Sequence, residues 1–177
     1  MVIKKYRSYY RSGIGLLEII VTDDAVVSLE FAEEEYLDNN TDDIIYMKKT
    51  DQHPLLKACT RQLDEYLKGR RKEFTLKLQP EGTDFQKRAW EELRKFPYGE
   101  TISYGEQARR LGNKNACRAV GGANGKNKIS IIIPCHRVIG KDGSLTGFGA
   151  GIQKKKWLLK HEQDTHRVIY CRTTPVF

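Results

Sequence analysis

The hydrophobic pattern of the first 80 residues is typical of a small domain with a few strands and one helix. Two apolar runs rich in β-branched residues are separated by Asp23 and Asp24, which favours a β-hairpin. A run with helical period ends before Gly69, a common helix-terminating residue. Residues 31–51 are acidic and polar, and we expect a long loop there. The expected elements are strands over residues 14–21, 25–31 and 74–78 and a helix over residues 55–67.

Beyond residue 80 the pattern changes to short amphipathic helices. Residues 79–82 are polar and rich in turn-forming residues, so we expect a linker there. Thr83 with Gln86, and Ser103 with Glu106, have the spacing of helix capping boxes. The expected elements are a helix from residue 83 to residue 93, a turn at 97–99, helices over 103–111 and 115–123 with a tight turn at 112–114, a short buried strand over 129–133, a glycine-rich mobile loop over 140–151 and a helix over 154–162.

These patterns predict a mixed α/β (α+β) protein with two domains. Residues 1–80 form an N-terminal domain with a short antiparallel sheet, a helix and a structural role. Residues 81–177 form a mainly helical C-terminal domain with a helix-turn-helix and a short strand that leads into Cys135. No apolar run is long enough to cross a bilayer, and residues 1–12 lack the apolar core of a signal peptide. We therefore expect an intracellular protein without a membrane partner, in the cytoplasm of a prokaryote or the nucleus of a eukaryote.

The positive charge of the chain is concentrated in its second half. The formal net charge is +8; residues 1–80 hold 13 Lys and Arg against 14 Asp and Glu, and residues 81–177 hold 18 against 9. A basic half of this kind indicates a polyanionic partner, nucleic acid before others, although a solvated surface has the same composition. The Lys154–Lys156 run is expected to be such a solvated surface, with phosphate contact or loop bracing as the other interpretations.

The second helix of the helix-turn-helix is built mostly from small residues. Its one long cation is Arg118. Small residues allow the backbone to approach another surface closely, which suits DNA and suits tight helix packing equally well. The basic residues nearby favour DNA. The small residues are Ala116, Ala119, Gly121, Gly122 and Ala123.

The four cysteines have no spacing that indicates a disulfide framework or a zinc site. Cys59, Cys117, Cys135 and Cys171 are spread along the chain without a C-x-x-C pair, and no metal is expected. Each is then either a small buried apolar residue or a reactive thiol.

Cys135 has the neighbours that nucleophilic chemistry requires. It follows Pro134 at the end of the apolar run and precedes His136, which could accept the thiol proton through a water molecule or a sharp turn. Glu162 or Asp142 could orient the histidine. From these residues alone, a packed core cysteine remains the more common role.

Several motifs in a fixed order resemble the O(6)-alkylguanine-DNA alkyltransferases, also called methylated-DNA–protein-cysteine methyltransferases. The resemblance covers about residues 55–162, and residues 1–54 match only as a variable N-terminal domain. The motifs are Gly82-Thr83-Asp84-Phe85-Gln86, Pro97-Tyr98-Gly99-Glu100-Thr101, Ser103-Tyr104-Gly105-Glu106, Arg118-Ala119-Val120-Gly121, Ile133-Pro134-Cys135-His136-Arg137-Val138 and Leu158-Leu159 with Glu162.

The resemblance implies a role for each matching residue. Cys135 would accept the alkyl group, His136 would act through water as its base, and Glu162 would complete the hydrogen-bond chain. Asn127 would brace the turn before the active site, and Tyr104 would push the nucleotide out and protonate the departing guanine. Arg118 would fill the gap left in the DNA stack. The remaining implied residues are Lys114, Ala116, Cys117, Ala119 and Gly121 for DNA binding and Val138, Phe148 and Gly149 for the base pocket.

The family reaction implies a single-use repair protein. It would act as a monomer on double-stranded DNA that carries alkylated guanine, and less well on O(4)-alkylthymine. It would bind the minor groove and flip the nucleotide out. The alkyl donor is the DNA itself, so no cofactor is expected.

The chain departs from the family pattern at four positions, which bear on the range of accepted alkyl groups. They are Cys117, Lys128, Phe148 and Gly149. Two other functions stay open: a DNA-binding module without chemistry and a thiol hydrolase. The presence of Cys135, His136 and Glu162 argues against the first. The helix-turn-helix and the one-sided charge argue against the second.

Overall fold

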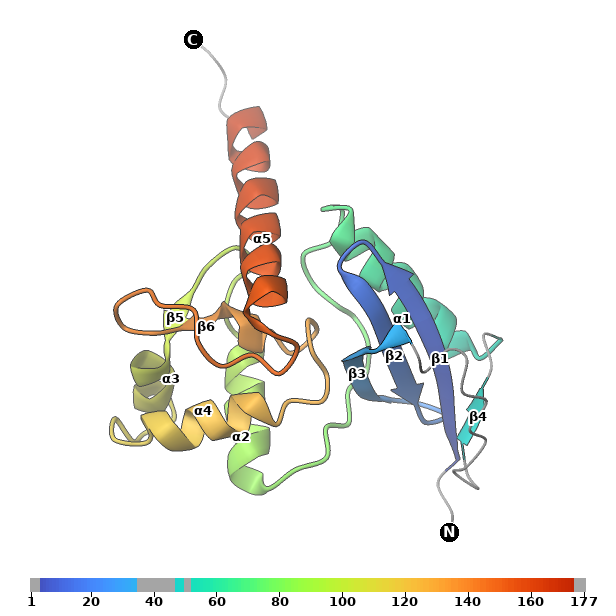
Figure 1. Ribbon diagram of the computed structural model, residues 1–177, viewed down its shortest axis with the longest axis horizontal. Helices are drawn as coiled ribbons and strands as arrows, with labels where there is room; N and C mark the ends of the chain where they lie inside the picture. The colour runs from blue at the N-terminus through green and yellow to red at the C-terminus, as the bar shows by residue number, and fades with distance from the viewer. Residues whose placement is uncertain (1–3, 35–46, 50–51, 174–177) are drawn as a thin grey trace. The chain divides into compact units, whose positions relative to one another are not determined.

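The computed structural model describes residues 4–34, 47–49 and 52–173, which form two compact units (Figure 1). The first unit comprises Met1–Glu81 and Lys128–Ser130, and the second comprises Gly82–Asn127 and Ile131–Phe177. The main boundary thus falls within the stretch 79–82. Among the described residues, no helix is long and apolar enough to span a membrane.

A four-stranded sheet with the order β3-β2-β1-β4 forms the body of the first unit. β2 pairs antiparallel with β1 and with β3, and β4 runs parallel to β1. The hairpin expected around Asp23 and Asp24 is confirmed as β2 and β3. The strands are β1 (Lys5–Ser12), β2 (Gly15–Val21), β3 (Val26–Ala32) and β4 (Met47–Lys49).

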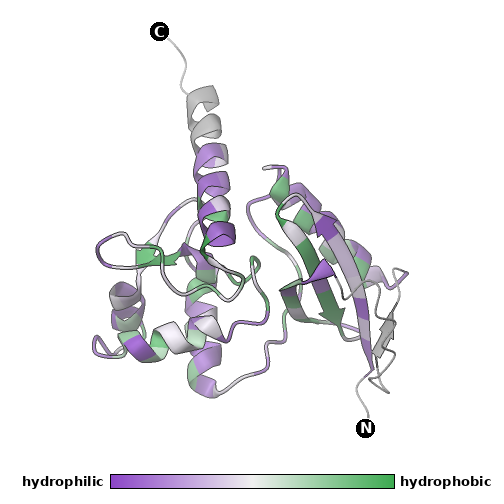
Figure 2. Ribbon diagram, in the orientation of Figure 1, coloured by the Kyte–Doolittle hydropathy of each residue, from purple (hydrophilic) through white to green (hydrophobic). Residues whose placement is uncertain are grey.

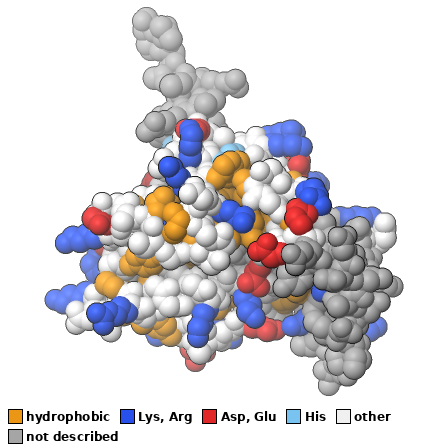
Figure 3. Space-filling view, viewed as in Figure 1, with side chains coloured by type: hydrophobic (Ala, Val, Ile, Leu, Met, Phe, Trp, Pro, Cys, Tyr) orange, Lys and Arg blue, Asp and Glu red, His pale blue; other side chains and the backbone are white. Residues whose placement is uncertain are grey.

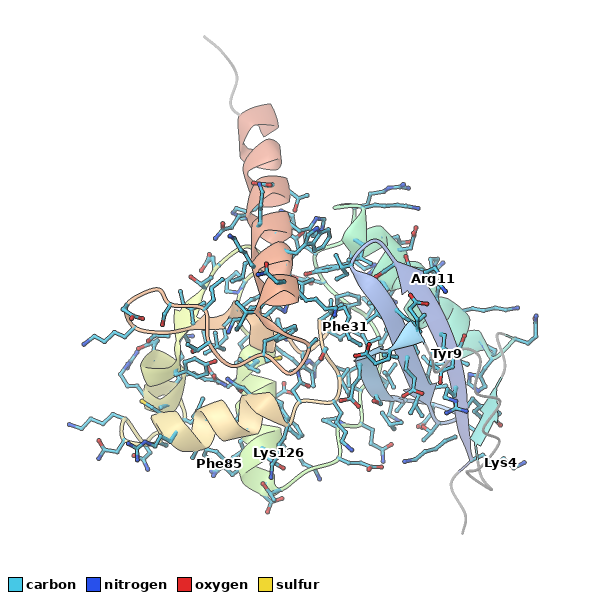
Figure 4. The ribbon with its side chains drawn as sticks, in the orientation of Figure 1. Lys4, Tyr9, Arg11, Phe31, Phe85 and Lys126 are labelled. Carbon is cyan, nitrogen blue, oxygen red and sulfur yellow. The ribbon has the colours of Figure 1, made fainter. Side chains whose placement is uncertain are left out.

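Two strands of the first unit, β1 and β4, were not expected from the hydrophobic pattern. β1 is polar, and its polarity is satisfied across the sheet: Tyr9 is the register partner of Glu18, and its hydroxyl donates to Glu18 Oε1 at 3.0 Å. Tyr9 and Arg11 extend from β1 as labelled in Figure 4. The expectation of a loop is wrong for residues 47–49, which form β4, while residues 35–46 and 50–51 lie outside the described residues.

One helix, α1 (Pro54–Leu67), covers the sheet of the first unit (Figure 1). It begins with Pro54, and it ends before Gly69, whose φ is +70°, as the pattern predicted. It packs against β1 and β2, and Figure 2 shows hydrophobic residues along β2. The expected strand over residues 74–78 is wrong, because only Leu78 forms an isolated bridge, to Val26.

Residues 128–130 return to the first unit and extend its sheet locally. Leu29 of β3 donates its N–H to the carbonyl of Lys128 at 2.7 Å, and Ser130 donates to the carbonyl of Leu29 at 2.8 Å. Ile129 is fully buried and bridges Leu29 in parallel. The backbone groups on either side of Ile129 are therefore satisfied by β3.

The second unit is mainly helical and contains the expected helix-turn-helix as α3 and α4. Ser103 caps α3 through its side chain, but Glu106 does not complete the box and instead binds Arg109 and Arg110. The elements are α2 (Asp84–Arg94), β5 (Ile102–Ser103), α3 (Tyr104–Arg110), α4 (Cys117–Gly125), the 3-10 turn η2 (Cys135–Arg137), β6 (Val138–Ile139) and α5 (Ile152–Thr173).

Buried polar contacts fix α4 against α2 and α3. The indole N–H of Trp90 donates to the carbonyl of Ala123 at 2.8 Å, and the amides of Gln107 and Asn124 pair at 2.8 Å. α2 begins with the predicted capping box of Thr83 and Gln86. These contacts connect three helices through groups that must be satisfied when buried, so the orientation of α4 is well determined.

Two other expectations for the second unit need correction. The run 129–133 is largely buried but does not form a strand: Ile131 has a φ of +72°, which turns the chain within the run. The last helix also continues beyond Glu162, because α5 extends to Thr173. Figure 2 shows that the part of α5 that is not drawn in grey is largely hydrophilic.

Candidate active site

Cys135 begins η2, at the end of the irregular buried run, and is itself buried. Its backbone N–H donates to the carbonyl of Ile133 at 2.8 Å. The side-chain amide of Asn127 donates to that same carbonyl at 2.8 Å and to Cys135 Sγ at 3.2 Å. Asn127 therefore holds the turn and supplies a donor to the sulfur, which favours a thiolate over a thiol.

His136 and Glu162 form a buried pair next to Cys135. His136 Nε2 lies 2.9 Å from Glu162 Oε1, and both side chains are 0% exposed. Among the described residues, no protein group bonds to His136 Nδ1. The histidine is thus oriented by α5 through one ring nitrogen, and its other nitrogen remains available. Glu162, and not the exposed Asp142, is the carboxylate that the histidine uses.

Arg137 occupies the remaining positions around Glu162. Its Nε donates to Oε2 at 2.9 Å and its Nη2 to Oε1 at 3.0 Å, while Nη1 donates to the carbonyl of Phe96 at 2.6 Å. The backbone N–H of Gly99 adds a bond to Oε2 at 3.0 Å. The two carboxylate oxygens together accept four hydrogen bonds, in the parallel two-bond geometry that arginine forms with carboxylates.

The electrostatics of the site leave a neutral thiol beside a neutral histidine. Burial raises the pKa of Cys135, and the hydrogen bond from Asn127 and the charge of Lys155 oppose that rise. Burial also lowers the pKa of His136, opposed by Glu162 and reinforced by Arg137 and Lys155. Burial alone would raise the pKa of Glu162, but its contacts with His136 and Arg137 outweigh burial and lower it. The charged pair at rest is therefore Arg137 with Glu162.

Lys155, like Arg137, is a residue of the site that sequence reasoning missed. A solvated surface was expected for the Lys154–Lys156 run, and this is wrong for Lys155, which is fully buried. Its ammonium group donates to the carbonyls of Val138 and Thr146, both at 2.6 Å. Lys155 therefore braces the loop 140–151, the role that had been left as another interpretation. The loop has neither helix nor strand, and its mobility stays a prediction.

Tyr104 lies between α4 and the loop 140–151. Its hydroxyl donates to the carbonyl of Thr146 at 2.9 Å. A Cβ placed on Gly121 of α4 would lie 3.8 Å from the Tyr104 ring, and one on Gly147 would lie 2.9 Å from its hydroxyl. The second distance is too short for a real contact, so glycine at position 147 leaves room for the Tyr104 hydroxyl, while the first is an ordinary van der Waals contact. Lys155 Nζ is 5.8 Å from the centre of the same ring. Tyr104 and Lys155 both donate a hydrogen bond to the carbonyl of Thr146.

The residues predicted to bind DNA lie on α4 or just before it. Arg118 and Ala119 are exposed on the helix, and Lys114 is exposed in the preceding turn. The partly exposed members of this set are Ala116, Cys117 and Gly121. Figure 4 labels Lys126, which follows α4 and adds a further cation at its other end. Figure 3 shows Lys and Arg side chains around the visible face of this unit.

The residues predicted to line the base pocket lie in β6 and in the loop 140–151 that follows it. Val138 is fully buried at the start of β6, immediately after η2. Phe148 is partly exposed and Gly149 is exposed in the loop 140–151. The structure therefore pairs Asn127 with Cys135 and Glu162 with the adjacent His136, connects Tyr104 to the loop, and leaves Arg118 at the surface.

Two family models together match nearly the whole chain. Residues 5–80 match the ribonuclease-like domain of 6-O-methylguanine DNA methyltransferase, and residues 84–164 match its DNA-binding domain. A methylated-DNA–protein-cysteine methyltransferase of Haemophilus influenzae is 42% identical over 159 residues, which are 89% of this chain and 86% of the relative. One from Mycobacterium tuberculosis is 43% identical over 152 residues, 86% of this chain and 88% of the relative.

Solved structures agree with these matches. The crystal structure of an O6-methylguanine methyltransferase of M. tuberculosis has a TM-score of 0.78 at 38% identity, covering 91% of this chain and 94% of that one. The M. tuberculosis protein OGT in complex with DNA has a TM-score of 0.81 at 39% identity, with 90% and 94% covered.

Proposed function

The chain belongs to the O(6)-alkylguanine-DNA alkyltransferase family, and from this membership we propose that its DNA-repair reaction, methyl transfer to a cysteine, takes place on Cys135. The protein is a methylated-DNA–protein-cysteine methyltransferase by the same comparisons. The observation that carries the assignment is a buried sulfur that accepts a bond from Asn127, next in sequence to a buried histidine that Glu162 holds through Nε2 and whose Nδ1 has no protein partner among the described residues.

The transfer is a displacement at the alkyl carbon. Cys135 Sγ forms a bond to that carbon, and the bond from the carbon to O6 of guanine breaks with its electron pair going to the base. His136 Nδ1 takes the thiol proton through a bridging water, since Nε2 is already engaged by Glu162. Tyr104 or the protonated histidine returns a proton to the departing guanine. The product is a thioether, a poor leaving group, so each protein molecule reacts once.

DNA bearing an alkylated guanine is the proposed substrate, and α4 is the proposed recognition element. An alkyl group on O6 of guanine is buried in duplex DNA, so the nucleotide must be flipped out before it can reach Cys135. The small residues of α4 suit a minor groove, and Arg118, which is exposed on this helix, would enter the stack. We propose a monomer as the active form and O(4)-alkylthymine as a poorer substrate.

Tyr104 and the loop 140–151 form the proposed gate of the base pocket. The bond from the Tyr104 hydroxyl to Thr146 orients the ring towards this loop before DNA binds. An incoming base competes for that hydroxyl, and Val138, Phe148 and Gly149 supply the surrounding surface. Phe148 offers no hydroxyl, so the pocket depends on shape and on backbone groups to bind the base.

Intact-protein mass spectrometry with peptide mapping tests the assignment. After incubation with a duplex carrying one O(6)-methylguanine, we expect one methylene of added mass per protein on the peptide that contains Cys135. Cys135→Ala should abolish the transfer and keep lesion binding, while Cys117→Ala, which removes a partly exposed thiol, should still be methylated. Methylation of the Cys135→Ala variant would exclude Cys135 as the acceptor. Tight binding by the unaltered protein without added mass would identify a recognition protein instead.

A further inference from the structure

Arg137 is buried next to the reacting groups, although the proposed transfer gives it no step. Its guanidinium is held by both oxygens of Glu162 and by the carbonyl of Phe96. Only 6% of the residue is exposed. The Tyr98 ring lies 5.7 Å from its central carbon. Arginine held at this many points is fixed in position, so its charge acts on Glu162 in one defined geometry.

The carboxylate that bonds His136 therefore carries a negative charge that Arg137 partly neutralises. Glu162 Oε1 receives both His136 Nε2 and Arg137 Nη2, at 2.9 and 3.0 Å. A carboxylate beside a histidine ordinarily favours the imidazolium form. A guanidinium on the same carboxylate opposes that preference, because its positive charge offsets part of the field of the carboxylate at the histidine.

We propose that Arg137 is a positioning residue for the alkyl transfer, which by occupying both oxygens of Glu162 keeps His136 neutral and able to take the proton of Cys135. The proposal rests on the function proposed above. It assigns separate tasks to the two partners of Glu162: His136 handles the proton, and Arg137 determines how strongly the carboxylate attracts it. A neutral histidine is the only form with an acceptor nitrogen to offer.

The other charged and titratable groups near His136 come from α5, from η2 and from the segment 96–99. Lys155 on α5 carries a positive charge that also disfavours the imidazolium. Cys135 is the proton donor. On the segment 96–99, the groups that face the site are the Phe96 carbonyl, the Gly99 N–H and Tyr98, whose hydroxyl bonds Thr165. His166, one turn beyond Glu162, lies against Gly99. Glu162 is thus the one anion paired with His136 among the described residues.

The rate of methyl transfer in a single turnover, measured against pH, tests the proposal. In Arg137→Met, the uncompensated Glu162 should hold a proton on His136, so the acidic limb of the profile should move to higher pH by roughly one to two pH units. The rate should recover in alkaline solution. Arg137→Lys restores the charge and should return the limb towards that of the unaltered protein. Lys160→Met removes an exposed cation of α5 and should leave the profile in place.

A loss of equal size at every pH, or a shift to lower pH, would overturn the proposal, because the first indicates a purely structural role and the second an imidazolium-dependent reaction. Nitrogen NMR of the imidazole rings gives an independent measurement if Arg137→Met does not fold. In the unaltered protein, the pKa of His136 should lie below the ordinary value of a histidine. A pKa of His136 at or above that ordinary value would refute the proposal. This readout needs no activity, so it stays valid if Cys135 proves not to be the acceptor.

Discussion

Glu162→Gln tests how far the second unit depends on one buried carboxylate. The carboxylate accepts two bonds at Oε1, from His136 and Arg137, and two at Oε2, from Arg137 and Gly99. Glutamine keeps the shape but replaces one oxygen with an NH₂ group, so one pair of donors faces another donor. The substitution also leaves the Arg137 guanidinium without its counter-ion in a buried position.

The expected destabilisation is large. Removing one partner of a buried ion pair costs about 3–5 kcal/mol, since the other charge stays buried and uncompensated. At the lower end of that range, the Tm of a chain of this length should fall by roughly 6–12 °C. Circular dichroism of thermal unfolding at neutral pH measures the change.

A second substitution separates the ion pair from general damage. Arg137→Met in the Glu162→Gln background removes the stranded charge, so the double variant should be more stable than the sum of the two single losses predicts. A coupling of about 1 kcal/mol or more is expected for residues in contact. Strict additivity, or a fall in Tm of less than about 2 °C for Glu162→Gln, would refute the view that this pair stabilises the unit.

Three further predictions concern pH, DNA and the loop. Glu162 and His136 both have a lowered pKa in the folded protein, so each contributes stability above its unfolded pKa that is lost as pH falls. The free energy of unfolding, measured with denaturant, should therefore fall below about pH 6.5, and an unchanged value down to about pH 4 would contradict this. Arg118→Ala should slow repair of duplex DNA more than reaction with a free O(6)-alkylguanine base, and equal losses on both would argue against its role in flipping. Lys155→Met removes the donor to Val138 and Thr146, so limited proteolysis within residues 140–151 should become faster; an unchanged cleavage rate would mean that Lys155 does not hold the loop.

Local signals predicted the elements that depend on local chemistry. Thr83 with Gln86 marked the start of α2, and Gly69 marked the end of α1, because capping and positive φ are properties of a few neighbouring residues. β1 escaped prediction because cross-strand polar pairs such as Tyr9 with Glu18 replace the usual alternation. The backbone of Ile131 was equally hidden, since an apolar run says nothing about φ.

Some residues of the site can be predicted from a sequence motif, and others are brought together only by the fold. Cys135 and His136 are adjacent in sequence, and the family resemblance added Glu162, which the residues alone could not separate from Asp142. Arg137 and Lys155 were missed because lysine and arginine are usually exposed. Each has a buried partner far along the chain, Val138 for Lys155 at 17 residues and Glu162 for Arg137 at 25 residues, and no local pattern records such a pairing.

The path of residues 128–130 sets a limit on dividing this protein by genetic truncation. A fragment that starts at Gly82 would retain Lys128–Ser130 but lose β3, leaving the buried Ile129 exposed to water and two backbone hydrogen bonds unmade. The loose segment would be flanked by Asn127, which holds the Cys135 sulfur, and by Ile131, whose unusual backbone angle needs support from its surroundings. A boundary drawn where the linker and the DNA-binding family match begin would therefore separate residues 128–130 from the strand that they pair with. The unit without the proposed acceptor cysteine thus supplies the support for a segment that lies between two parts of the other unit.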